Sequence, residues 1–296
     1  MTRFRSASLI AGAAVCLELL LPGEPVYHSG WYNVALAALL VVAAVSARGV
    51  FTRAKRLRSR LATAAVAAGA IVVGMAGVAN GLFAPDNRDV IGAPGQRVRV
   101  ESLGTLLFPF VNGDATTVTL ERPLHAPLPI GSRRRNSGSF VLRTLPRSVV
   151  YVEARDLRGN RLTVTQPQGT VFLSPVLLMQ QHQTIVGMDV PFDSFNVPSA
   201  ARVIKAILFD SRQAAAFLHD PSIAAGAVLF AVDDENDRPL AHGIAMSADG
   251  HEVRAANLRL RGEIVSYPQV EVVSTPNLVA VLLGLLLLAG GLIARI

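Results

Sequence analysis

Cysteine is almost absent from this chain of 296 residues, which contains Cys16 and no other. A single cysteine cannot form an intramolecular disulfide, a CxxC redox pair, a thiolate zinc site or a CxxCH haem-attachment motif. If the function of this protein involves thiol chemistry, a partner protein must therefore supply the thiols. Val15 is too large for the residue before a lipidated cysteine, so we interpret Cys16 as a small buried thiol in a helix.

The sequence also lacks the short motifs of common enzymes. It contains no GxGxxG, GxxxxGK[ST], HExxH or GxSxG pattern, so nucleotide binding, zinc proteolysis and esterase activity have no support. The acidic run 233–237 lacks the ligand spacing of a calcium loop, and we interpret it as a solvated turn between strands. No nucleophile, base and orienting group are placed together, and we therefore expect an accessory component that is not an enzyme.

Apolar residues, in contrast, are abundant. They make up 51% of the chain, and the mean hydropathy of +0.42 is high for a soluble domain. A helix needs about 20 residues to cross a bilayer, and four stretches approach or reach this length: residues 8–21, 31–47, 61–83 and 277–296. The sequence thus predicts three N-terminal transmembrane helices within residues 1–83 and one C-terminal helix, 277–296.

The first stretch has an alternative reading. Arg3 and Arg5 precede its apolar run, as in a signal peptide. The run ends in Leu20-Leu21-Pro22-Gly23 without a small-x-small cleavage site. We therefore favour a retained helix, which must lie against its neighbours or close to an interface because it contains Glu18.

The basic residues lie where they fix an orientation. The connector 48–60 contains six basic residues and no acidic residue, and by the positive-inside rule it faces the cytoplasm together with the N-terminus. Segment 84–276 is then extracytoplasmic and the C-terminus cytoplasmic. This segment contains 19 basic and 19 acidic residues, so topology explains the net charge of +7. We therefore expect the lipid bilayer and no nucleic acid as a partner. The predicted location is the bacterial cytoplasmic membrane, although a thylakoid membrane would fit the same topology.

The outer segment 84–276 is rich in alternating sequence. Alternation of apolar and polar residues predicts strands at 97–101, 116–121, 139–144, 148–153, 161–165 and 263–273. Turn signals at 112–114, 158–160 and 248–250 separate such strands. One amphipathic helix is expected at Ser199–Leu218. The predicted fold class is thus a membrane protein of helices plus a β-rich, sandwich-like outer domain.

One of the six histidines lies in a distinctive setting. His28 belongs to Tyr27-His28-Ser29-Gly30-Trp31 at the outer mouth of the second helix, where aromatic rings favour the membrane interface. The same rings could flank a flat apolar cofactor. The basic segment 133–139 could meet anionic lipid headgroups or an acidic partner, although a plain exposed loop is the simpler interpretation.

The layout resembles the ResB-like membrane proteins of cytochrome c biogenesis, known as System II. Three regions carry the resemblance. Residues 27–48 resemble the second helix of that family, residues 68–100 its third helix and following strand, and residues 270–294 its last strand and terminal helix. These regions cover about a third of the chain, and they match in apolar and small residues instead of catalytic signatures.

The resemblance implies a function in haem delivery to apocytochrome c. ResB-like proteins act with an integral membrane partner of the ResC or CcsA type, and a thiol-reducing partner belongs to the same pathway. The family uses one histidine near the start of the third helix and one in the outer domain as axial haem ligands. Residues 60–66 contain no histidine, whereas His251 is a candidate for the second ligand. The expected haem-binding residues are therefore His28, His251, Tyr27 and Trp31.

A second hypothesis keeps the architecture without haem. Here the chain is a membrane-anchored scaffold whose outer β-rich domain binds another protein. An exposed edge of that domain or the segment 133–139 is the expected docking surface.

Overall fold

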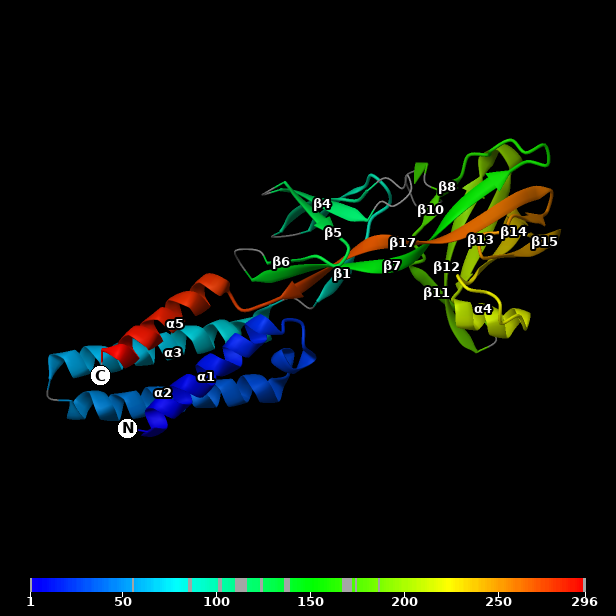
Figure 1. Cartoon of the computed structure of the whole chain (residues 1–296). Coiled ribbons are helices and arrows are strands. Elements are labelled where there is room, and N and C mark those ends of the chain that lie inside the picture. Colours follow the sequence, from blue (N-terminus) through cyan, green and yellow to red (C-terminus); the bar gives the residue numbers. More distant parts are fainter. Residues whose placement is uncertain are drawn as a thin grey trace. The chain divides into compact units, whose positions relative to one another are not determined.

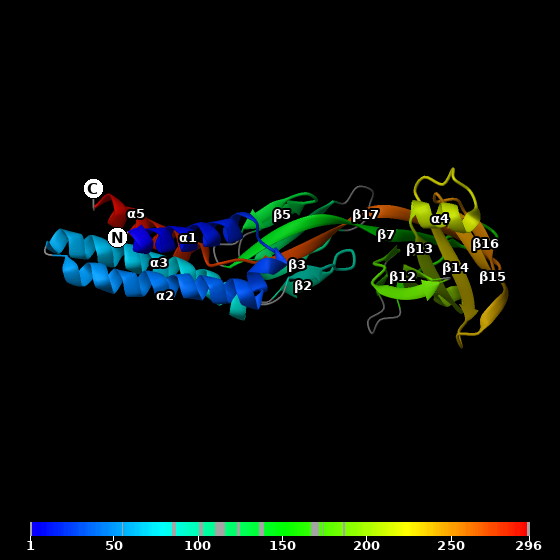
Figure 2. The ribbon, with the colours of Figure 1, turned by 90° about the horizontal axis from the view of Figure 1, so that it is seen from below.

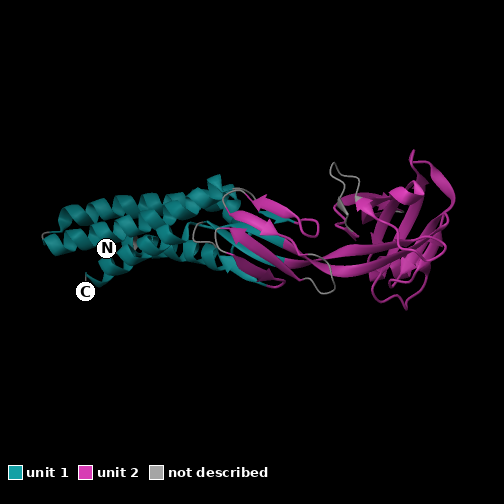
Figure 3. Cartoon of the chain, turned by 90° about the horizontal axis from the view of Figure 1, so that it is seen from above, with its two compact units in different colours: residues 1–90, 132–144, 270–296 teal, residues 91–131, 145–269 magenta. Residues whose placement is uncertain are grey.

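The computed structural model describes residues 2–54, 56–84, 87–100, 103–109, 116–122, 125–135, 139–166, 172–173, 175–185 and 187–294. The chain forms two compact units, which are coloured separately in Figure 3. Residues 1–90, 132–144 and 270–296 make up the helical unit, and residues 91–131 and 145–269 make up the β unit. The helical unit thus includes residues 84–90, 132–144 and 270–276 from the segment predicted to lie outside the membrane.

The helical unit is built around its third helix. Its helices are α1 (Thr2–Leu20), η1 (Pro25–His28), α2 (Gly30–Arg53), α3 (Leu57–Phe83) and α5 (Leu278–Ile293). The central helix α3 contacts α1, α2 and α5, and Figure 1 shows α5 beside it. Among the described residues, α2 and α3 are long and apolar enough to cross a membrane, and α5 is a shorter apolar helix of 16 residues.

Glycine allows the closest helix contacts. A Cβ atom at Gly69 of α3 would lie 2.5 Å from the carbonyl oxygen of Gly284, and a Cβ at Gly291 would lie 2.7 Å from the carbonyl oxygen of Ala62. Small residues at these positions let the backbones of α3 and α5 approach directly, as in helix pairs within membranes.

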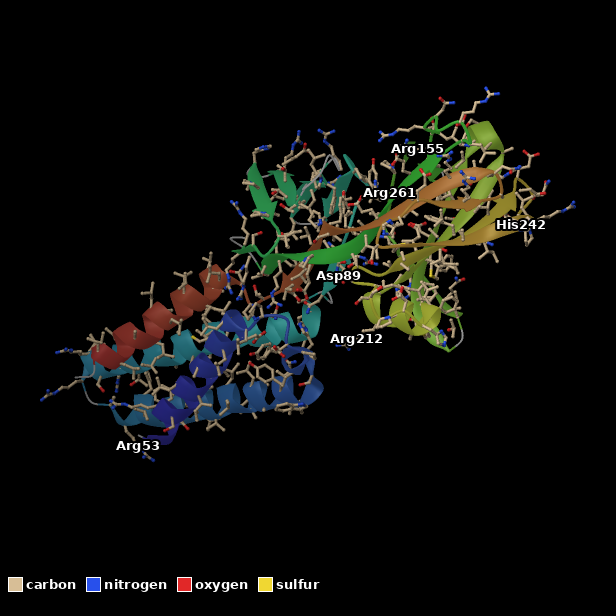
Figure 4. The ribbon with its side chains drawn as sticks, turned by 45° about the vertical axis from the view of Figure 1, so that its right-hand side comes forward. Arg53, Asp89, Arg155, Arg212, His242 and Arg261 are labelled. Carbon is tan, nitrogen blue, oxygen red and sulfur yellow. The ribbon has the colours of Figure 1, made fainter. Side chains whose placement is uncertain are left out.

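The segment between the second and third helices is shorter than predicted. The sequence predicts a basic connector at 48–60, but α2 continues to Arg53 and α3 already begins at Leu57. The arginines extend these helices because a long basic side chain is compatible with helical backbone. Figure 4 shows Arg53 at the end of α2 with its side chain directed away from the helices.

The strands form three antiparallel sheets. The first has the order β1-β17-β7-β10, with β16 on β17 and β6 on β7; the second has the order β15-β14-β13-β12-β8-β9, with β11 on β12; the third has the order β2-β3-β4-β5. Strands β7 and β17 each belong partly to both units. The bounds in the first sheet are β1 (Arg88–Val90), β6 (Arg133–Arg135), β7 (Phe140–Arg155), β10 (Val176–Leu177), β16 (Val253–Ala255) and β17 (Leu258–Ser274).

The other two sheets belong to the β unit. The second sheet contains β8 (Thr165–Gln166), β9 (Phe172–Leu173), β11 (Gln181–Ile185), β12 (Met188–Val197), β13 (Arg202–Phe209), β14 (Ala227–Asp234) and β15 (Pro239–Ala248). The third contains β2 (Arg97–Val100), β3 (Gly104–Leu107), β4 (Thr117–Arg122) and β5 (Ala126–Pro129).

The main core of the β unit lies between two sheets. Val150 and Val152 of β7 and Leu260 of β17 belong to the same buried cluster as Phe195 of β12 and Phe230 of β14. The two phenylalanine rings pack edge to face with centroids 6.4 Å apart. Burial of these large side chains is the main stabilising contribution in this region.

The helix predicted at Ser199–Leu218 is wrong over most of its length. Residues 198–200 form the 3-10 helix η2 (Pro198–Ala200), β13 follows, and only α4 (Ser211–Leu218) is α-helical. A continuous apolar run buried on both faces of a central strand can imitate helical spacing. The true helix start is Asp210, whose carboxylate accepts from the Gln213 backbone N–H in a capping box. Helix α4 packs beside β13 (Figure 2).

Other strand predictions are partly confirmed. Strand β2 covers 97–100 of the predicted 97–101, β4 covers 117–122 where 116–121 was predicted, and β17 contains 263–273. The strands predicted at 139–144 and 148–153 are one strand, β7, which continues through Pro146. Within 161–165, only Arg161 forms an isolated bridge and Thr165 begins β8.

The predicted turns have different outcomes. The turns at 158–160 and 248–250 are present, with positive φ at Gly159, Asp249 and Gly250. The acidic run also ends in a turn, where Asp234 accepts from the backbone of Asn236 and Arg238. The turn predicted at 112–114 lies outside the described residues.

The basic segment 133–139 is not a plain loop. Arg133–Arg135 form β6, which pairs with β7 in the register Arg133↔Arg143; residues 136–138 lie outside the described part of the chain. The guanidinium of Arg133 donates to the carbonyl of Leu20 at 3.3 Å, and that of Arg135 donates to the carbonyl of Leu19. These arginines therefore satisfy carbonyl groups left open at the end of α1.

Candidate functional site

The aromatic residues predicted to bind haem do not form a slot. Tyr27 is buried, and its ring packs edge to face on Tyr32 with centroids 5.4 Å apart. The ring of Trp31 also packs edge to face on Tyr32, with centroids 6.2 Å apart, and Trp31 is 67% exposed. His28 ends η1 beside them and is partly exposed. Tyr32, which sequence reasoning did not select, is the residue that joins Tyr27 and Trp31.

His251 belongs to the other unit. It is exposed and follows the turn 248–250, where its backbone N–H donates to Ala248 and its carbonyl accepts from the Ser247 hydroxyl. The structure therefore brings Tyr27, His28 and Trp31 together in the helical unit and places His251 in the β unit.

These residues do not fit a haem held by two histidines in one unit. His28 is the single histidine in the helical unit's stretches of sequence. Imidazole nitrogen is a common axial donor to haem iron, and His28 offers one such donor. Across the described part of the chain, no group of three or more His, Cys, Asp or Glu residues could hold a metal ion.

A buried polar cluster lies inside the helical unit instead. Glu18 of α1 is 1% exposed, and its carboxylate accepts from the Asn80 amide of α3 at 2.8 Å and from the Tyr32 hydroxyl of α2 at 3.3 Å. One acidic residue thus connects three helices. We call Glu18, Tyr32, Asn33 and Asn80 the polar cluster.

Asn33 completes the cluster at the start of α2. Its amide nitrogen donates to the carbonyls of Tyr27 and Ser29, at 3.1 and 3.0 Å. The side-chain oxygens of Asn33 and Asn80 are buried without a hydrogen-bond partner among the described residues. Buried acceptors of this kind are normally satisfied, so the cluster has spare capacity to accept a hydrogen bond.

Two glycines of α3 make room for this cluster. A Cβ atom at Gly77 would lie 3.3 Å from Glu18 Oε2 and 2.7 Å from Val15, and a Cβ at Gly81 would overlap the Asn33 amide. In the sequence, the signal was Glu18 within an apolar stretch, since ionisable residues in such helices usually face the bundle interior. Its partners could not be read from spacing, because Asn80 lies 62 residues away.

The β unit has a separate polar cavity of about 510 Å³. Arg147, His182 and Asp189 line it, and His182 Nδ1 lies 3.2 Å from a carboxylate oxygen of Asp189. The Arg147 guanidinium already donates to Gln269 and to the carbonyl of Met179. In the hydrogen bonds of the described residues, His182 is joined to Asp189 and to no hydroxyl group.

Comparison of the chain with protein-family models, with curated proteins and with solved structures finds no match. The class of the protein therefore rests on its architecture: apolar helices, a β-rich region of three sheets and a C-terminal apolar helix.

Proposed function

We propose that the protein is a ResB-like accessory component of cytochrome c biogenesis, anchored in the bacterial cytoplasmic membrane by its helical unit. The membrane placement rests on one observation, namely that the outer surface of the helices exposes apolar side chains. In their most apolar 18-residue windows, 22% of α2 and 44% of α3 is buried inside the protein. Large side chains such as Val41, Val45 and Leu286 are exposed. A core helix of a soluble protein would be covered.

The orientation follows from the charges at one end of the bundle. Arg53 ends α2, and Arg58 and Arg60 lie in the first turn of α3. Basic residues at this end face the cytoplasm under the positive-inside rule. The N- and C-termini are then cytoplasmic, and segment 84–276 is extracytoplasmic.

In this proposal the chain assists haem delivery together with a ResC or CcsA type integral membrane partner. The order of three helices, a β-rich region and a last helix supports the proposal, as do the stretches of sequence that resemble the family. Because His28 is the one imidazole in the helical unit, most of the haem ligation falls to the partner. Apocytochrome c, or a thiol-reducing protein, is the expected partner on the outer side.

An absorption spectrum of the purified protein, oxidised and dithionite-reduced, tests the haem role. The spectra are recorded for the chain alone and for the complex with the membrane protein that accompanies it. We expect a Soret band in the complex, weakened by His28→Ala and unchanged by His219→Ala, an exposed control in the β unit. The variant His251→Ala shows whether the β unit contributes a haem ligand. A complex without a Soret band would contradict haem handling.

A second candidate function is a membrane-anchored scaffold without haem. The observation that favours it is the edge strand β15, where Ile244 is 73% exposed. The carbonyl of His242 on this edge accepts from the Ala256 backbone N–H, and other parts of an edge strand with an exposed apolar residue can add an extended segment of another protein. Figure 4 shows His242 on this strand pointing outward, and its positive φ marks a bulge that bends the edge.

Co-purification from detergent-solubilised membranes tests the scaffold. Ile244→Lys is expected to abolish capture of the bound partner, because a charge replaces an apolar contact at the strand edge. Leu157→Lys is the matched control, since Leu157 is 49% exposed elsewhere in the β unit. If both variants capture equal amounts of the partner, β15 is not the docking edge.

A further inference from the structure

An apolar cavity of about 600 Å³ lies in the helical unit beneath two arginines. Its apolar wall is made by Leu19 and Leu20 at the end of α1 and by Leu278 at the start of α5. Cys16 also lines it, as do Arg133 and Arg135 of β6, and the cavity is open to its surroundings. Its lining is therefore amphipathic and combines hydrocarbon with positive charge.

The two arginines point to the same side. Residues two apart on a strand face the same way, and both guanidinium groups reach the last carbonyls of α1. Each guanidinium has five N–H donors, and the hydrogen bonds to Leu20 and Leu19 use only part of this capacity. Among the described residues, no carboxylate lies within ion-pair distance of either guanidinium.

The charge of this pair is therefore not neutralised by the protein. Burial and, to a smaller extent, the neighbouring charge of Arg133 lower the pKa of Arg135. The N-terminus of α5 begins at Leu278, in the wall of the same cavity, and its partial positive charge adds to the field. An anion is the ligand that this basic part of the lining favours.

We propose that the cavity binds one anionic phospholipid of the outer leaflet, with an acyl chain along Leu19, Leu20 and Leu278 and the phosphate at Arg133 and Arg135. This inference rests on the proposed membrane placement. Guanidinium groups recognise phosphate through paired hydrogen bonds, and apolar walls match an acyl chain. A soluble acidic peptide would satisfy the arginines but leave the apolar wall exposed to water. Capping of α1 alone would not require an open apolar cavity beside the arginines.

Cys16 provides a specific reporter because it is the single cysteine of the chain and lines the cavity. The full-length protein in a neutral detergent is alkylated with N-ethylmaleimide in the presence of phosphatidylglycerol or of phosphatidylcholine with the same acyl chains. At a phosphatidylglycerol concentration of about ten times its dissociation constant, mass action predicts alkylation about tenfold slower. Phosphatidylcholine is expected to protect much less.

The arginine variants separate lipid binding from helix capping. Arg133→Gln with Arg135→Gln keeps hydrogen-bond donors for the α1 carbonyls but removes the charge, and we expect it to lose the protection by phosphatidylglycerol. Arg143→Gln is the matched control. Arg143 also donates to an α1-proximal carbonyl, that of Pro22 at 2.6 Å, but it has Glu271 as an acidic partner at 3.5 Å and does not line the cavity.

Three results would overturn the lipid site. They are equal protection by the two lipids, protection that survives in the double variant, and loss of protection in Arg143→Gln. An unchanged melting temperature of the double variant excludes a folding defect, and native mass spectra of the unmodified protein are expected to retain the lipid that the double variant loses. Failure of the membrane placement would look different, since the protein would then be released from membranes without detergent.

Discussion

The helical unit and the β unit use opposite kinds of side chain in their closest contacts. Gly69 and Gly284 bring the backbones of α3 and α5 together, whereas Phe195 and Phe230 fill the space between the sheets of the β unit. Glycine contacts gain little from removing apolar surface from water. They are effective where the outer surface is already in an apolar solvent and close packing is the main attraction.

The outer surfaces differ in the same sense. Among the residues that the structure describes, five exposed large hydrophobic side chains lie in the β unit, namely Leu145, Leu157, Phe217, Leu218 and Ile244. The rest lie in the helical unit, and most of them are on its helices. A surface of this kind is stable in lipid and prone to aggregate in water, so the contrast supports different environments for the two units.

The two units also treat charged groups differently. The helical unit buries Glu18 in the polar cluster, with partners on two other helices. In the β unit, ion pairs such as Arg97 with Glu121 and Arg161 with Glu153 have an exposed arginine, and the buried Asp233 pairs with the exposed Lys205. Exposed pairs contribute little to stability, whereas an isolated buried carboxylate requires partners.

The largest expected effect is at the contact between α3 and α5. Gly284→Leu places a side chain against Val73 and the backbone at Gly69, and overpacking at a backbone contact is expected to cost about 3 kcal/mol or more. Melting in detergent, followed by circular dichroism, measures the loss. Gly290→Leu is the control, because nothing lies within 4 Å of its added Cβ atom. If both variants have the same melting temperature, close packing at Gly284 does not stabilise the contact between α3 and α5.

The β unit should respond to loss of a large side chain instead. Phe230→Ala removes a fully buried ring and is expected to destabilise the β unit by about 3–5 kcal/mol. The β signal in denaturant unfolding of the whole protein measures this effect. Phe217→Ala, at a partly exposed ring, should cost distinctly less. A smaller loss for Phe230→Ala than for Phe217→Ala would contradict the assignment of the core.

A smaller effect is expected in the polar cluster. Glu18→Leu leaves the Asn80 amide without its acceptor, and an unpaired buried donor costs about 1–3 kcal/mol. Glu18→Gln keeps an acceptor oxygen and should cost less. Thermal melting in detergent compares the two variants. Equal stability of Glu18→Leu and the unmodified protein would show that the cluster does not join the three helices.

The smallest effect is a pH dependence in the β unit. Burial raises the pKa of Asp193 above its ordinary 3.8, so the native state holds a proton more tightly than the unfolded state. The resulting stability is present below the ordinary pKa and is lost as the pH rises through the native one. Asp193→Asn removes this dependence and should be more stable relative to the unmodified protein at neutral pH than in acid. Parallel stability curves against pH for the two proteins would rule out this assignment.

The architecture is readable from the sequence where one pattern dominates. Long apolar runs predicted α2 and α3, and alternation predicted β2, β4 and β17. The prediction at Ser199–Leu218 was wrong because the buried run of β13 has apolar residues at helical as well as strand spacing. The capping pair Asp210 and Gln213 was the local signal for the true start of α4.

The candidate site was less predictable than the fold. Glu18 is visible as an acidic residue in an apolar run, but Asn80 and Tyr32 become its partners only through helix packing. Local sequence does not encode which helix faces meet. The arginines of β6 were visible as a basic cluster, whereas their contacts with the end of α1 also depend on tertiary structure.

Thiol accessibility in intact cells tests the proposed membrane placement most directly. Cys16 is replaced by Ser, and a single cysteine is introduced by Glu235→Cys in the turn before β15 or by Ala54→Cys at the end of α2. With a membrane-impermeant maleimide, the expected result is labelling of the first variant in cells with a permeable outer envelope, and of the second only after the cytoplasmic membrane is opened. Labelling of Ala54→Cys in intact cells, or recovery of the protein in the soluble fraction, would contradict a helical unit that spans the membrane with the β unit outside.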